Sequence, residues 1–273
     1  MRGSYFLLIG FVFSSFVALS FSPRSMAKVD AEYPAPLIRE QRRVVVNGVA
    51  EIWTLKWRSR PKPACAPDEL SLTCPCAGFA YGESGDLDLI RSRDDLVVDR
   101  FHITPLFQGA PFADVDGALL QRWRPDYDRD ANLVDEPNFT AFAARRPVVR
   151  IMDLKDYNHD GQSTEFYLQT ETLPCQKSAG VVIGVSKDNP VLHVFRAASN
   201  AGEPLVMKKF EWDALPNASG PVRLTDWHCG DHASETTTVV DLSSSAGSIE
   251  GSRLTYSCTA DDQPGQLLSK EPL

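Results

Sequence analysis

After its first 27 residues the sequence lacks an apolar run long enough to cross a membrane, since a spanning helix needs about 20 such residues. It also lacks a P-loop, a Gly-x-Ser-x-Gly elbow, a dinucleotide fingerprint and a His-Glu-x-x-His motif. Basic side chains are scarce, with 28 Lys and Arg against 36 Asp and Glu. Nucleic acid and anionic lipid both need a basic face, so this charge balance argues against both as partners.

The N-terminal 27 residues are typical of a secretory signal. Arg2 supplies a positive start, Tyr5 to Leu19 is mostly apolar, and Ser25-Met26-Ala27 suits cleavage. The apolar stretch is short for a membrane span, although an uncleaved anchor is an alternative. We therefore expect residues 28–273 to be secreted or periplasmic, in either case extracytoplasmic, with no membrane span after cleavage. Removing Arg2 and Arg24 leaves 26 basic residues against 36 acidic ones.

The mature part is long enough for one large domain or two small ones. We expect a single mainly-β domain over 28–273, with a possible seam near 109–117 and poorly ordered tails at 28–41 and 259–273. Nothing at the seam resembles a flexible linker, which favours one continuous domain.

Alternating polar and apolar residues with many β-branched and aromatic side chains predict strands along most of the chain. The expected fold is mainly β, an antiparallel sandwich- or barrel-like sheet with one or two short helices near residues 116–146. Asn47-Gly48 is the strongest hairpin signal, and Gly82–Gly85 predicts a second turn. The helices are expected at 116–123 and 137–146, and the strands at 43–46, 49–57, 77–81, 86–91, 95–103, 147–153, 165–172, 179–185, 191–196, 205–212, 222–228, 236–242 and 253–258.

Six cysteines in a chain expected to be exported predict disulfides. We expect one bridge among Cys65, Cys74 and Cys76, and another between Cys229 and Cys258. The remaining pair would then involve Cys175.

The most informative motif is an acidic loop at 156–165. Side-chain oxygens of Asp156, Asn158 and Asp160 alternate along it, and Gly161 permits a turn with positive φ. The carbonyl of Gln162 and the carboxylate of Glu165 extend the set of oxygens that one hard cation could use. This pattern predicts a calcium site, with Asp153 as a spare carboxylate.

The loop and its neighbours resemble the calcium loops of FG-GAP or VCBS-type repeat proteins. Predicted strands at 148–152 and 165–168 flank an Asp-x-Asn-x-Asp-Gly sequence, as in that family. The family usually closes the loop with an acid at position 9, whereas position 9 here is Thr164 and the acid is Glu165. The resemblance covers about twenty residues and implies a local ion site rather than a propeller.

An earlier acidic sequence repeats the pattern 30 residues upstream. Asp126, Asp128 and Asp130 take the first three ligand positions, but Ala131 replaces glycine, which costs on the order of 1 kcal/mol in a left-handed turn. An EF-hand is the competing analogy for both loops, but neither has the glutamate that ends an EF-hand loop at position 12. The alternative interpretation of either loop is an acidic surface turn that binds no metal.

A second cluster contains Asp226, His228 and His232. Its histidines are four apart, which on a helix would place both on one face, but the surroundings predict strand and turn. The expected function is an exported calcium-binding β protein with a structural, adhesive or ligand-binding role, and an unknown protein or carbohydrate partner at the cell surface. The alternative is a secreted hydrolase that uses this cluster or an unidentified carboxylate pair.

Overall fold

The computed structural model of the chain describes residues 37–65, 76–108, 117–126, 144–174, 177–197, 200–245 and 248–273. Residues 33–273 form one compact unit. The predicted signal at 1–27, most of the predicted seam at 109–117, and Asp128 and Asp130 lie outside the described residues. Within those ranges, no helix is both long enough and apolar enough to span a membrane.

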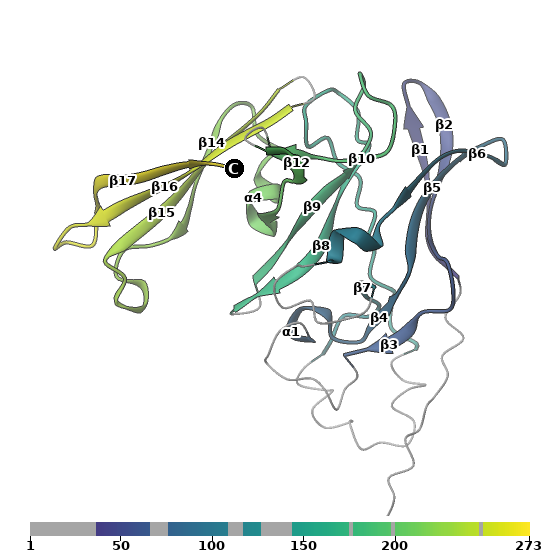
Figure 1. Cartoon of the computed structure of the whole chain (residues 1–273), viewed down its shortest axis with the longest axis horizontal. Helices are drawn as coiled ribbons and strands as arrows, with labels where there is room; N and C mark the ends of the chain where they lie inside the picture. Colours follow the sequence, from purple (N-terminus) through teal and green to yellow (C-terminus); the bar gives the residue numbers. More distant parts are fainter. Residues whose placement is uncertain are drawn as a thin grey trace, which may run out of the picture. The chain divides into compact units, whose positions relative to one another are not determined.

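The fold is mainly β and antiparallel, as the sequence predicts (Figure 1). One four-stranded sheet has the order β1-β2-β5-β6, formed by β1 (Ile38–Val46), β2 (Val49–Trp57), β5 (Leu87–Arg93) and β6 (Leu96–His102). A second has the order β10-β9-β13, with β8 also paired to β9. Its strands are β8 (Glu165–Leu173), β9 (Lys177–Gly184), β10 (His193–Val194) and β13 (Met207–Lys208).

The C-terminal sheet has the order β14-β15-β16-β17. It contains β14 (Val222–Trp227), β15 (Thr236–Ser245), β16 (Ser248–Cys258) and β17 (Pro264–Pro272). Smaller pairings complete the fold: β3 (Lys62–Ala64), β4 (Gly82–Gly85) and β7 (Ala118–Gln121) form one sheet, and β11 (Arg196–Ala197) pairs with β12 (Asn200–Pro204). Within the described residues, the helices are α1 (Cys76–Phe79) and α4 (Lys209–Ala214), with 3₁₀ turns η2 (Thr104–Phe107) and η4 (Asp231–Ala233).

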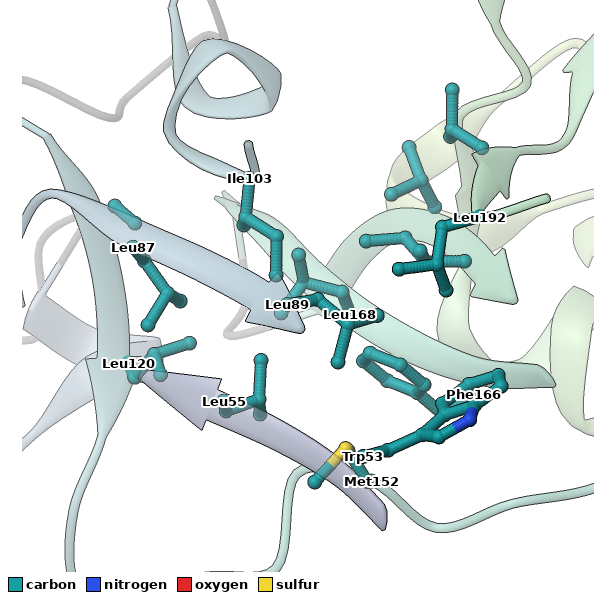
Figure 2. Close-up of a cluster of buried hydrophobic side chains, with 14 of the residues drawn as sticks. Trp53, Leu55, Leu87, Leu89, Ile103, Leu120, Met152, Phe166, Leu168 and Leu192 are labelled. Atoms are coloured by element: carbon teal, nitrogen blue, oxygen red, sulfur yellow. The ribbon is translucent and has the colours of Figure 1, made fainter. Parts of the chain in front are cut away.

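A large core joins the first two sheets. Its side chains come from β1, β2, β5, β7, β8, β9 and β10 and from adjoining segments. Figure 2 draws 14 of them and labels Trp53, Leu55, Leu87, Leu89, Ile103, Leu120, Met152, Phe166, Leu168 and Leu192. A second core lies where α4 and β9 meet β15 and β16. Its largest side chain is Trp212, which is fully buried and donates a hydrogen bond from its indole N–H to the Gly180 carbonyl at 2.9 Å.

Several local predictions are wrong. Gly82–Gly85 is strand β4, because it pairs with β3 and β7, and the preceding Cys76–Phe79 is helix α1. The predicted helix at 116–123 contains strand β7 instead, since Ala118–Gln121 pairs with β4. The predicted strand at 205–212 ends at Lys208 and continues as α4. The predicted helix at 137–146 falls mostly outside the described residues.

Both predicted tails contain paired strands. β1 begins at Ile38, inside the tail predicted at 28–41, and β17 occupies most of 259–273. β17 is almost entirely solvent-exposed, so its backbone pairing with β16, rather than burial of its side chains, holds it in place.

Candidate metal centre

The acidic loop connects an irregular segment to the start of β8. An isolated bridge closes its base, because Lys155 and Glu165 exchange two backbone hydrogen bonds of 2.8 and 3.2 Å. His159 and Gly161 both have positive φ, so the chain turns sharply between them. The loop is therefore a tight bend set on the first residue of a strand.

Backbone N–H groups gather the oxygens of the loop. Asp156 accepts from the N–H of Asp160 at 3.1 Å and of Gly161 at 3.0 Å. Asn158 Oδ1 accepts from the same Asp160 N–H at 3.1 Å, and Asp160 Oδ1 accepts from Gln162 at 2.9 Å. These bonds turn the three predicted ligand side chains, Asp156, Asn158 and Asp160, towards one short stretch of backbone.

Two distant turns are tied to the loop. Gln162 donates to and accepts from Asn47, at the tip of the β1–β2 hairpin, at 3.0 and 2.6 Å. Asp160 Oδ2 accepts from the Lys187 N–H, and Asn158 donates to Ser186 Oγ at 3.0 Å. Because the Gln162 side chain is committed to Asn47, only its backbone carbonyl could serve as a metal ligand.

Glu165 is the most perturbed carboxylate of the loop. It is fully buried, and its carboxylate accepts from the Tyr157 N–H at 2.9 Å and from the Thr164 hydroxyl at 2.8 Å. Burial, with a smaller contribution from the negative charges of Asp160 and Asp156, raises the pKa of Glu165 to about 8, against the opposing effect of these two hydrogen bonds. Its side chain is thus turned into the protein interior rather than towards solvent.

The loop also packs against the second core. Tyr157 is buried and meets Trp212 edge-on, with ring centroids 5.9 Å apart. Burial raises the pKa of the Tyr157 phenol far above its usual range. His159 Nε2 hydrogen-bonds the Leu215 carbonyl at 2.8 Å, which ties the loop to the end of α4.

The fit to a cation is partial. Across the part of the chain with assigned structure, no three His, Cys, Asp or Glu side chains form a group that could hold a metal ion. The available ligand set is therefore Asp156, Asn158 and Asp160 with the Gln162 carbonyl, a mixed oxygen set of the kind calcium accepts. In the same ranges, no lysine, arginine or histidine forms an ion pair with Asp156, Asp160 or Glu165.

The upstream acidic sequence contributes one described residue. Asp126 lines a groove to which residues 146–151 also contribute, and Asp128 and Asp130 fall outside the described residues. The upstream calcium site therefore stays a prediction.

In the cluster of Asp226, His228 and His232, the aspartate and one histidine make contacts with residues outside the cluster. Asp226 forms an ion pair with Lys208, and His232 stacks on Trp227 with ring centroids 5.6 Å apart. Between them, Cys229 is bridged to Cys258, as predicted. No hydrogen bond links Asp226 to either histidine within the described chain.

The other predicted disulfide is also present. Cys65 is bridged to Cys76, one of the pairings left open, while Cys74 and Cys175 lie outside the described residues. Two disulfides are typical of proteins that fold in an oxidising compartment.

Sequence reasoning missed the neighbours of the loop. Asn47 is 115 residues from Gln162, and the Ser186–Asn189 turn carries no pattern that points to Asn158. Comparison of the chain with protein-family models, curated proteins and solved structures gave no match.

Proposed function

We propose that this is an exported β protein in which a calcium ion at Asp156–Gln162 stabilises the junction of several strands. The observation that carries the proposal is geometric: hydrogen bonds within one tight loop bring the oxygens of Asp156, Asn158 and Asp160 together, and neither aspartate forms an ion pair within the described residues. A divalent cation would supply the missing positive charge.

The position of the loop explains what such an ion would do. The loop is hydrogen-bonded to the β1–β2 hairpin through Asn47, to the turn after β9 through Lys187, and to the end of α4 through His159. An ion bound only by the folded loop would stabilise all three contacts by mass action. The role is therefore structural, in support of recognition of a protein or carbohydrate at the cell surface.

Export is part of the proposal. It is supported by the signal-like sequence of residues 1–27 and by the bridges Cys65–Cys76 and Cys229–Cys258. The hydrolase alternative gains no support, because Asp226 is paired with Lys208 and the disulfide at Cys229 holds the segment between the two histidines.

Melting temperature tests the proposal. We expect the mature protein to melt at a higher temperature in 10 mM calcium than in chelator, and Asp160→Ala to abolish the difference. With a Kd of about 0.1–1 mM, as in extracellular modules, the gain would be about 1.4–2.7 kcal/mol. Asp261→Ala, in the exposed turn before β17, is the matched control and should keep the full calcium effect. Equal melting temperatures with calcium and chelator would refute the proposal.

A further inference from the structure

A groove of about 1370 Å³ runs along the edge of β8 that is not paired with β9. Tyr167 and Leu168 both line it, although successive side chains of a strand point to opposite faces of the sheet. A groove that both can reach must lie along the strand edge. Residues 146–151 form part of its lining.

The strand edge in this groove offers free backbone groups. Glu165 exchanges its backbone hydrogen bonds with Lys155, so its N–H and C=O point away from β9. Groups two residues apart point the same way, which turns the backbone of Tyr167 and Gln169 towards the groove. Val182 lies opposite Tyr167 in the ladder, and its carbonyl accepts a hydrogen bond from the Phe195 N–H instead of one from β8. This pair of residues therefore points its backbone groups away from the β8–β9 interface, in agreement with the orientation of Tyr167.

Two of these four backbone groups are the ones that a ligand strand would use. The phenol of Tyr157 lies near the backbone of Tyr167. Among the described residues, no hydrogen bond outside the β8–β9 ladder involves the Tyr167 carbonyl or the Gln169 N–H. In a parallel sheet, each alternate residue of the added strand donates its N–H to the carbonyl of one residue of the neighbouring strand. The same residue accepts, through its C=O, from the N–H two residues further along that neighbouring strand.

The groove is basic although the chain carries a net charge of −8. Its lining holds five Arg or Lys and three Asp. Asp153 and Asp213 lie 3.6 and 3.7 Å from Lys155, and Asp213 also pairs with Lys209, so these two lysines compensate both carboxylates. Arg124 and Arg150 are exposed, and neither forms an ion pair within the described residues. Arg124, Arg146 and Arg150 then stand against one remaining carboxylate of the lining, Asp126, so three positive charges minus one leave a formal surplus of two at this end.

We propose that this groove binds an extended acidic peptide, which adds a strand to the edge of β8 and places carboxylates on Arg124 and Arg150. Strand addition supplies main-chain hydrogen bonds, and guanidinium groups bind carboxylates through two parallel N–H donors. The free backbone pair favours a peptide over an acidic saccharide, which would use the charges alone. The proposal does not depend on calcium at the acidic loop.

The test uses fluorescein-labelled hexapeptides in which Glu alternates with Val, and fluorescence polarisation with the full mature protein. We expect the acidic peptide to bind at least tenfold more tightly than its Lys-for-Glu counterpart, with affinity falling as salt rises. Arg124→Glu/Arg150→Glu should weaken binding at least tenfold. Arg43→Glu, an exposed arginine on β1 outside the groove, should change it less than twofold.

Peptide N-methylation tests strand addition on the unaltered protein. Methylating one alternate set of amides should abolish binding and methylating the other set should preserve it, because only one set faces β8. Equal binding of both methylated peptides would overturn the proposal. So would an absence of preference for acidic hexapeptides across a library of alternating sequences, or an oligogalacturonate that binds tenfold more tightly than every peptide.

Discussion

The carboxylate of Glu165 accepts a hydrogen bond from the backbone N–H of Tyr157, eight residues earlier, at 2.9 Å. This bond crosses the base of the acidic loop and lies in the protein interior, since both residues are almost fully buried. The loop is thereby fastened from inside, while Asp156 and Asp160 are only partly buried.

Glu165 should make stability depend on pH. Folding raises its pKa from 4.5 to about 8, so the native protein holds a proton that the unfolded chain releases between these values. Its contribution is fully present below pH 4.5 and is lost as pH rises through about 8, by up to about 1.4 kcal/mol per pH unit.

Urea denaturation in chelator from pH 5 to 9 measures this slope. Glu165→Gln should flatten the curve, because the amide cannot release a proton. Glu250→Gln, an exposed position on β16, serves as the control and should leave the curve unchanged. An identical slope in Glu165→Gln and the parent protein would contradict the assignment.

Gly184 should tolerate no side chain. A Cβ there would lie 2.2 Å from the Thr164 carbonyl oxygen and 2.9 Å from Glu165 Cγ, so β8 and β9 would have to separate. We expect Gly184→Ala to lower the free energy of unfolding by about 2–3 kcal/mol. Gly220→Ala, where a Cβ meets nothing within 4 Å, should change it by less than about 0.5 kcal/mol in the same denaturation assay. Similar losses for both variants would show that the close approach is not limiting.

The buried ion pair between Glu51 and Arg91 should be costly to break. Their side chains are 0% and 4% exposed and lie 2.8 Å apart, and Arg93 also binds Glu51. Glu51→Ala would leave Arg91 buried without this partner, which should cost about 3–5 kcal/mol. Arg223→Ala breaks the exposed pair with Asp241 and should cost no more than about 1 kcal/mol. Thermal or urea unfolding of both variants gives the comparison, and equal costs would be the contrary result.

The Cys229–Cys258 bridge should stabilise the C-terminal sheet. It connects residues 29 apart, and closing such a loop restricts the unfolded chain. The double substitution of both cysteines by Ala should lower the free energy of unfolding by about 2–5 kcal/mol. An unchanged unfolding midpoint would show that strand pairing of β15 with β16 suffices by itself.

Local signals predicted part of the fold. Asn47-Gly48 forms the β1–β2 turn as expected, because Asn and Gly accept the positive φ values of 49° and 81° found there. Gly82–Gly85 has the composition of a turn but pairs on both sides as β4, and only tertiary contact decides this. The start of α4 depends on Glu211, whose carboxylate accepts from the Lys208 N–H at 2.8 Å.

The acidic loop, too, could be predicted only in part from local sequence. The alternation of Asp156, Asn158 and Asp160 and the need for Gly161 are readable from the sequence, and the structure does turn there. The sequence placed Glu165 among the ligand oxygens, whereas its hydrogen bonds hold it in the interior. Burial of that kind depends on residues such as Gly184, far along the chain, and no local pattern encodes it.

Isothermal titration of calcium into the chelator-treated mature protein measures ion binding at the acidic loop itself. We expect saturable binding with a Kd of about 0.1–1 mM, abolished by Asp160→Ala and retained by Asp261→Ala. Titrations that show no saturable heat up to about 10 mM calcium, or an unchanged isotherm in Asp160→Ala, would contradict it.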